Sequence, residues 1–451
     1  MSKFRKLLKY RILLEAMAVG LLTGFVISAM RAMIIVADAI RGRLVAYANS
    51  SLAGAIITVV ILLILAAVIA ILLYIEPDIS GSGIPQLEGE LRGLDDQCWW
   101  RVLPAKLAGC VLSIGGGLSL GREGPSVQLG AMVGKGWSRS IHTGRVEEHL
   151  MMTCGAAAGL SAAFGAPLAG AIFALEELHR SFSVRILITA MSAAAVSDYI
   201  ACEIVGLKPV FDFNLMNALP HRYYGWVVVM GVILGIIGFA YNKIIELMQN
   251  AGDRINAAII RRYGRKSPLA QLPSMLVIFC IAALLVFVYP KALGSGGNLP
   301  LEIAGGQMAI GTLMLLFVVK LLYSTASFGS GAPGGIFLPL LVLGALVGGI
   351  FSELVTNTAG MSSIYAANFV IIGMAGMFAA IVRAPATGIV LISEMSGGMT
   401  SMLALVIVSL AAYITADVLN AQPVYEQLLE RRQRKKKQLM VQPKGEESHA
   451  V

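Results

Sequence analysis

The chain has 451 residues, of which 57% are hydrophobic and only 14% are charged, and its formal net charge is +9. With a mean hydropathy of +0.78, a soluble protein would expose far too much apolar surface, so an ordinary soluble domain is excluded. The positive charge gathers in short clusters, Lys3–Arg11, Arg254–Lys266 and Arg431–Lys437, which indicates cytoplasmic loops of a membrane protein rather than nucleic-acid binding.

Strongly apolar runs recur along the chain, among them Ile56–Leu73, Trp226–Ala240 and Met275–Val288. A membrane span needs roughly 20 mostly apolar residues, and each of these runs can form the core of one. The 49 glycines suit closely packed transmembrane helices. The sequence therefore predicts an all-α polytopic membrane protein in a lipid bilayer. The first apolar run is too long for a cleavable signal, and no clear cleavage site follows it.

Three segments join glycines to a proline at a predicted helix start. They are GSGIP at Gly81–Pro85, GREGP at Gly121–Pro125 and GGIFLP at Gly334–Pro339. Proline is tolerated in the first turn, where free backbone N–H groups carry about half a positive charge. Inside a bilayer these groups need a partner, so we predict broken, partly non-spanning helices whose starts hold an anion. The alternative is that each segment is a surface loop.

The second of these segments places Glu123 at a helix start that suits negative charge. Its carboxylate can occupy the position of an anion and can also carry a proton. One residue would then couple proton movement to anion movement. The alternative is a surface glutamate that caps its own helix.

Weak internal similarity relates the two halves of the chain. Glu123–Gly134 aligns with Phe337–Gly348, and Gly155–Glu177 aligns with Gly373–Met395. Two ordered matches at nearly one offset predict an internal duplication. The alternative is a chance match between segments rich in glycine and alanine.

Charge predicts that the halves have opposite orientations. The first half has its strongest basic cluster before its first helix, whereas the second half has Arg254–Lys266 after its first helix. If basic loops are cytoplasmic, the halves form two inverted-topology repeats, as in many secondary transporters. We predict a basic cytoplasmic N-terminus (1–11), a first transmembrane repeat (12–205), an extracytoplasmic linker (206–222), a second transmembrane repeat (223–425) and a basic cytoplasmic tail (426–451).

Signatures of cofactor chemistry are missing from the sequence. The five cysteines have no CxxC spacing, the five histidines form no HExxH pattern, and GGGLSLGREG lacks the lysine and hydroxyl of a P-loop. We therefore predict no metal site, no cofactor and no enzymatic activity.

Four motifs in order, GSGIP, GREGP, GGIFLP and the late PVYEQLL, resemble the signature of the CLC family of chloride channels and proton-coupled chloride transporters. The resemblance runs from about Leu13 to Leu429 and is closest to the bacterial H+/Cl- exchange transporters. It implies a CLC-type fold with inverted repeats, and a homodimer with one ion pathway in each subunit.

The resemblance also implies an anion site. Ser82 matches the serine whose hydroxyl touches the central anion, and Tyr425 matches the tyrosine whose hydroxyl completes that site. Ile336 and Phe337 match the pair whose backbone amides hold the anion. Ser82 points to chloride, because relatives that prefer fluoride or nitrate depart from serine there.

Two glutamates are implied in proton transfer. Glu123 matches the gating glutamate on the external side, and Glu177 matches the inner glutamate that hands protons to the cytoplasm in antiporters, where channels usually carry an apolar residue. The pair Glu176 and Glu177 is costly at the end of an apolar helix unless it meets water or takes up a proton. We expect Glu176 to be an ordinary solvated helix end and Glu394 to be a structural acid bonded to nearby backbone.

The favoured function is proton-coupled chloride antiport, with chloride and protons as the transported ions. The alternative is a passive voltage- or pH-gated chloride channel of the same fold. We expect a multi-pass protein of the cell inner (plasma) membrane with both termini cytoplasmic, and no CBS domains in the tail. Lys106 and Arg122 either raise the local positive potential or are paired structurally.

Overall fold

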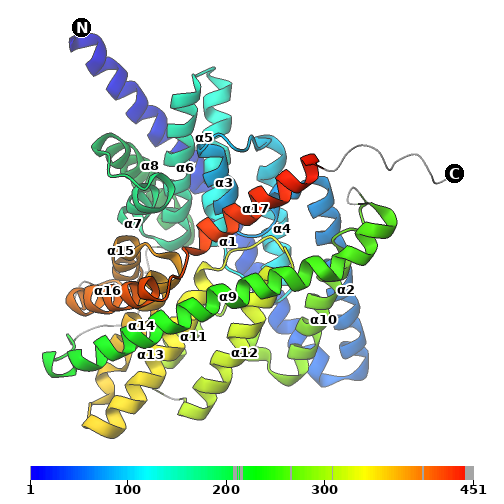
Figure 1. Ribbon diagram of the computed structural model, residues 1–451, viewed down its shortest axis with the longest axis vertical. Helices are drawn as coiled ribbons and strands as arrows, with labels where there is room; N and C mark the ends of the chain where they lie inside the picture. Colours follow the sequence, from blue (N-terminus) through cyan, green and yellow to red (C-terminus); the bar gives the residue numbers. More distant parts are fainter. Residues whose placement is uncertain are drawn as a thin grey trace.

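The computed structural model describes residues 2–206, 211, 213, 217–264, 267–306, 308–398 and 401–441. Within these ranges the ordered structure is helical, and no strand occurs beyond one isolated bridge. The described residues include seven helices that are long and apolar enough to cross a membrane. The prediction of an all-α polytopic membrane protein is confirmed, and Figure 1 shows the helices crossing at many angles rather than as one parallel bundle.

The elements of the first half are α1 (Ser2–Ser50), α2 (Leu52–Ile75), η1 (Pro77–Ile79), α3 (Ile84–Leu91), α4 (Trp99–Gly115), α5 (Glu123–Ser140), α6 (Arg145–Phe164), α7 (Pro167–Phe173), the π-helix η2 (Ala174–His179) and α8 (Val184–Val205). Those of the second half are η3 (His221–Tyr223), α9 (Tyr224–Tyr263), α10 (Leu272–Val288), η4 (Pro290–Ala292), α11 (Leu299–Ala304), α12 (Ile310–Gly329), α13 (Phe337–Ala359), η5 (Ser363–Tyr365), α14 (Ala366–Val382), α15 (Pro385–Met395), α16 (Met402–Val418) and α17 (Val424–Val441).

Parts of four predicted segments lie outside the described residues. They are residue 1 of the N-terminus, residues 207–210, 212 and 214–216 of the linker, residues 265–266, 307 and 399–400 of the second repeat, and residues 442–451 of the tail. The basic N-terminal segment belongs to α1, and the described part of the tail belongs to α17, so both are helical.

Helix α9 is longer than a helix needs to be to cross a membrane. This helix has 40 residues, which makes it about 60 Å long, roughly twice the thickness of a bilayer core. It runs obliquely across the whole molecule in Figure 1. Its predicted apolar run, Trp226–Ala240, fills only the first half, and the second half carries the described part of the basic cluster that starts at Arg254.

Burial identifies the centre of the protein. Most residues of α5, α13 and α14 are buried, whereas α2 and α8 expose many apolar side chains on their outer faces, as lipid-facing helices do. Close helix contacts depend on glycine. A Cβ on Gly130 would lie 2.0 Å from the carbonyl oxygen of Gly155, and one on the equivalent Gly344 would lie 2.4 Å from that of Gly373. Any side chain at these positions would force the helices apart.

The two halves meet in a reciprocal bridge. Gly121 and Gly335 are 214 residues apart (335 − 121), the same offset as between the aligned segments Glu123–Gly134 and Phe337–Gly348. They form an isolated antiparallel bridge in which each backbone N–H donates to the other carbonyl at 2.7 Å. Equivalent segments therefore run in opposite directions where they touch, which supports the predicted inverted repeat.

A second reciprocal contact corrects one expectation. Glu176 accepts hydrogen bonds from the backbone N–H groups of Ala386 and Thr387 at the start of α15, at 3.1 and 2.6 Å. Glu394 accepts from two N–H groups at the start of α7, at 3.1 and 2.8 Å. The expectation that Glu176 is a solvated helix end is wrong, because its carboxylate satisfies free amides of the other half. The structural role expected for Glu394 is confirmed, although the backbone it binds also lies in the other half.

Candidate functional site

All three predicted helix starts are present. Helix α3 begins after Gly83, whose φ of 93° is accessible mainly to glycine, α5 begins after Arg122, and α13 begins after Ile336. None of these three cap residues makes a capping hydrogen bond through its side chain. The first amides of α5 and α13 therefore lack the usual capping partner and suit an anion, whereas the first amide of α3, that of Ile84, donates to the Ser82 hydroxyl at 3.3 Å.

The three starts converge on one buried place. The N–H of Gly334 donates to the carbonyl of Gly81 at 3.0 Å. A Cβ on Gly124 would lie 2.7 Å from the Cβ of Ser82, and one on Gly335 would lie 3.1 Å from the nitrogen of Gly124. The alternative of three separate surface loops is therefore wrong.

Each predicted anion-binding residue lies at this junction. Ser82 is 1% exposed, and Ile336 and Phe337 are equally buried. The hydroxyl of Ser82 accepts a hydrogen bond from the N–H of Ile84 at 3.3 Å, which leaves its own proton free to point elsewhere. The Phe337 ring lies against neighbouring aromatic rings with centroids 5.3 and 4.6 Å away, which fixes the start of α13.

Tyr425 reaches the same region from the start of α17. Its side chain is fully buried, and its hydroxyl has no hydrogen-bond partner among the described residues. Buried hydroxyl groups are normally bonded, so this donor indicates a ligand as its partner. Tyr425 lies within electrostatic range of both Glu123 and Glu177, the two predicted proton carriers.

Glu123 is the first residue of α5 and is fully buried. Neither carboxylate oxygen makes a hydrogen bond of good geometry to a described residue. One oxygen lies against Gly121, beside the backbone amide of Leu338 at the start of α13. The carboxylate thus occupies a place where amides of a second helix can stabilise negative charge, and the alternative of a surface capping glutamate is wrong.

Glu177 lies in the π-helix η2 and is 5% exposed. Its Oε1 atom has no hydrogen-bond partner among the described residues. Nearby, Arg180 forms ion pairs with Glu426 at 3.1 Å and Glu88 at 3.5 Å. Glu177 is therefore a buried acid beside a partly exposed charged cluster, an arrangement that suits proton uptake.

A cavity of about 860 Å³ leads to Ser82 from the side of α9 and α17. Arg432 on its wall donates to Asp78 at 2.6 Å and to Asp95 at 3.1 Å, and Arg431 donates to Asp253 at 2.5 Å. These pairs connect α17, which carries Tyr425, to η1, to the loop between α3 and α4, and to α9.

Two buried lysines donate hydrogen bonds to backbone carbonyls near the site. Lys106 is fully buried and donates to the carbonyls of Ile79 at 2.8 Å and Gly81 at 2.6 Å, so it is paired structurally. Lys320 is equally buried and donates to the carbonyl of Gly294 at 2.7 Å. The sequence analysis did not single out Lys320. A lone lysine within an apolar run could have indicated a functional or structural contact, because a charge in a membrane helix needs a partner.

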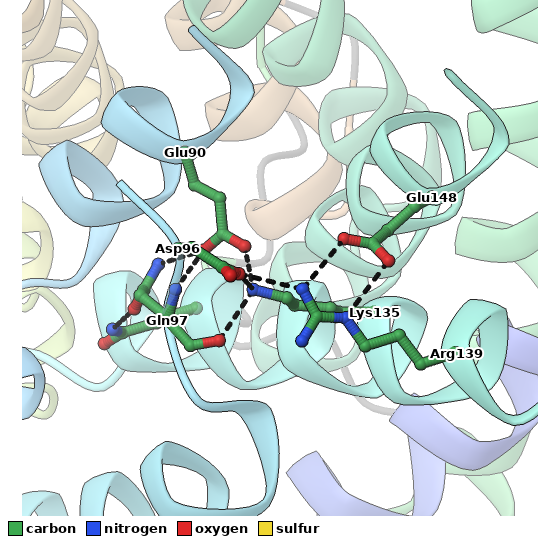
Figure 2. Close-up of polar contacts among 7 residues, drawn as sticks. Glu90, Asp96, Gln97, Lys135, Arg139 and Glu148 are labelled. Atoms are coloured by element: carbon green, nitrogen blue, oxygen red, sulfur yellow. Dashed lines mark hydrogen bonds and ion pairs between the residues drawn. The ribbon is translucent and has the colours of Figure 1, made fainter. Parts of the chain in front are cut away.

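A third buried lysine joins α5 to α3. Figure 2 shows Lys135 directed toward Glu90, Asp96 and Gln97. It donates to Glu90, to Asp96 at 2.6 Å and to the carbonyl of Gln97 at 2.6 Å. The bond from Lys135 holds the pKa of the exposed loop carboxyl of Asp96 below its usual range. Helix α5 is thus fastened near its end to the end of α3 and to the loop that follows α3.

Removal of the Lys135 charge is expected to destabilise the protein. Lys135→Met leaves Glu90 buried without its partner, and such a loss costs about 3–5 kcal/mol. Lys135→Met with Glu90→Leu removes both charges and is expected to recover most of that loss. Thermal unfolding in detergent measures both effects. The control is Arg139→Met, which breaks half-exposed pairs worth about 0–1 kcal/mol, and equal effects of Lys135→Met and Arg139→Met would contradict the prediction.

Comparison with known proteins places this geometry in a family. A family model described as "Voltage gated chloride channel" matches residues 63–417. The H(+)/Cl(-) exchange transporter ClcA of Vibrio cholerae is 37% identical over 358 residues, which are 79% of this chain and 75% of the relative. ClcA of Citrobacter koseri is 34% identical over 429 residues, which are 93% of this chain and 88% of the relative.

Solved structures agree with the sequence comparison. The X-ray structure of a slow cyanobacterial Cl-/H+ antiporter matches with a TM-score of 0.87 and 30% identity, covering 95% of this chain and 99% of that chain. A eukaryotic CLC transporter matches with a TM-score of 0.76 at 22% identity, covering 94% of this chain and 75% of that chain, and shows the shared fold. Because the family match covers more than half of the chain and the relatives align along most of their lengths, the chain belongs to the voltage-gated chloride channel (CLC) family.

Proposed function

We propose that the chain is a proton-coupled chloride antiporter. The observation that carries this proposal is the pair of buried glutamates, Glu123 and Glu177, which both lie within electrostatic range of Tyr425. A passive channel needs a gate, but it has no use for a second buried carboxylate beside the pathway. The ClcA relatives and the cyanobacterial protein are named as exchangers, which favours antiport over a channel.

Chloride binds at the junction of the broken helices. The hydroxyls of Ser82 and Tyr425 and the backbone amides of Ile336 and Phe337 replace part of its water shell. Binding by neutral donors is weak enough for release, whereas a full positive charge would trap the ion. Chloride reaches this place from the cytoplasm through the cavity of about 860 Å³.

Protons and chloride compete through Glu123. When its carboxylate is ionised, it occupies the position beside the start of α13 and blocks the anion there. When it is protonated, it loses its attraction to the amides and yields that position to chloride. Glu177 supplies the proton from the cytoplasmic side, since an intramembrane acid is the least costly relay through apolar surroundings.

The transporter works as a multi-pass protein of the inner membrane, with both termini in the cytoplasm. Two inverted repeats, residues 12–205 and 223–425, form one pathway, and two copies assemble as a homodimer. The Gly121–Gly335 bridge and the Glu176 and Glu394 contacts support this division. Chloride is the substrate, protons are the coupling ion, and the protein acts as a transporter without a cofactor rather than as an enzyme.

The reversal potential of reconstituted vesicles tests the proposal. Under a fixed chloride gradient, an imposed pH gradient is expected to shift the reversal potential, because protons move with chloride. An unchanged reversal potential would mean that chloride moves alone, which would make the protein a passive channel.

Removal of either hydroxyl from the central site is expected to weaken chloride binding. A hydrogen bond to a charged group contributes about 1.5–3 kcal/mol, so Ser82→Ala and Tyr425→Phe should each weaken binding about tenfold or more. Isothermal titration with chloride measures the affinity. Tyr289→Phe is the control, because this hydroxyl is also buried without a partner among the described residues but belongs to the end of α10 rather than to one of the three helix starts. Unchanged affinity in both site variants would remove these side chains from the site.

A further inference from the structure

A second cavity, of about 500 Å³, is lined by Glu123 and by no residue of α17. Two arginines line it, Arg31 from α1 and Arg122 from the residue before α5. Neither forms an ion pair within 4.0 Å of a described acidic side chain. The cavity therefore contains two guanidinium groups without ion-pair partners among the described residues, together with the carboxylate of Glu123.

The two arginines are held close together. Arg31 donates to the carbonyl of Ala162 at 2.6 Å, and Arg122 donates to the neighbouring carbonyl of Ala163 at 3.2 Å. Their charges lie within range to repel each other. The ordinary explanation is that they satisfy the last carbonyls of α6, whose end carries about half a negative charge. This accounts for one N–H of each group, and a guanidinium has five.

The other charges of the cavity are already matched. Arg41 pairs with Asp38 at 2.6 Å, and Lys291 approaches Glu302 at 3.5 Å. Asp198 of α8 attracts Arg31 electrostatically but makes no ion pair with it. Glu123 attracts Arg122 electrostatically in the same way. A net positive charge therefore remains at Arg31 and Arg122 when Glu123 is protonated, and a small anion between them would then relieve the repulsion.

We propose that Arg31 and Arg122 form a further anion-binding site, external to Glu123, which takes a small monovalent anion such as chloride. Guanidinium groups are weakly hydrated and present paired donors, so they hold anions well at a cavity wall. The site keeps an ion next to the gate, ready to enter when protonated Glu123 yields its position. The external location and the identity of the ion rest on the proposed function.

Crystals of the full-length protein soaked in bromide test the site, because anomalous scattering locates bromide directly. The wild type is expected to show one peak between Arg31 and Arg122 and one beside Ser82 and Tyr425. Arg31→Gln keeps a donor for the carbonyl of Ala162 but removes the charge, so it should lose only the first peak. The control is Arg43→Gln, which removes the same charge from an exposed position of α1 outside the cavity, and it should keep both peaks.

Chloride uptake by right-side-out membrane vesicles shows whether the site serves transport. Arg31→Gln is expected to raise the half-saturating external chloride concentration about tenfold with little change in the maximal rate, whereas Arg43→Gln should behave as wild type. A wild-type crystal with a central peak but none between the arginines would overturn the inference alone, and so would unchanged half-saturation in Arg31→Gln. Absence of the central peak would instead contradict the proposed function.

Discussion

Proton transport is expected to disappear in Glu123→Gln, while chloride continues to cross the membrane. Glutamine has nearly the shape of a protonated glutamate but cannot release a proton. It also carries no negative charge, so the amides at the start of α13 no longer hold it in the anion position. The gate should therefore stay open to chloride and closed to proton exchange. Simultaneous recording of proton and chloride flux in reconstituted vesicles measures both.

The matched control is Glu302→Gln, because Glu302 lines the same cavity as Glu123 but is half-exposed and approaches Lys291. This variant should exchange protons for chloride as the wild type does. If Glu123→Gln vesicles still moved protons against their gradient, Glu123 would not be the gate, and the coupling would have to lie elsewhere in the protein.

Glu177→Gln is expected to separate proton transport from chloride binding. The neutral side chain cannot take up a proton from the cytoplasm, so proton flux should fall to background. The broken helix starts that we propose as the chloride site belong to other elements, so chloride affinity should stay at the wild-type value. Chloride flux should persist at some rate, because Glu123 still exchanges protons with the external solution. Flux recording together with chloride titration tests the two halves of this expectation.

The control for this variant must be an acidic residue that lies outside the predicted anion and proton sites and accepts no hydrogen bond from backbone amides. Glu176 is unsuitable although it is adjacent, because its carboxylate caps the start of α15. Glu430 of α17 is half-exposed and, among the residues that the structure describes, forms an ion pair with Arg434 alone, so Glu430→Gln should retain coupling. If the Glu177→Gln variant still pumped protons, Glu177 would not be the internal proton carrier, and a passive channel would describe the protein better.

The sequence predicts those parts of the site that depend on a few adjacent residues. The three helix starts are predictable because glycine and proline act on their own backbone, and the structure places all three where expected. Glu123 follows from the same local chemistry, since a carboxylate at a helix start suits the free amides. The roles of Ser82, Ile336, Phe337 and Tyr425 come from family resemblance, and they stay predictions that the burial and convergence of these residues support.

Contacts between distant residues could not be predicted. Nothing near Glu176 indicates that its partners lie 210 and 211 residues away. Lys135 looks like the end of an amphipathic helix, and only the fold brings Glu90 to it across 45 residues. The π-helix at Glu177 has no sequence signature either. In each case the outcome depends on tertiary packing rather than on local propensity.

The exchange of helix caps between the halves has a consequence for biosynthesis. Ribosomes add roughly 5–20 residues each second, so the 211 residues that separate Glu176 from the amide of Thr387 take roughly 10–40 s to make. Throughout that interval the nascent first half carries a carboxylate and free amides at the start of α7 that must stay in contact with water or the insertion machinery. The first half therefore cannot reach its final packing in the bilayer until the ribosome has passed α15.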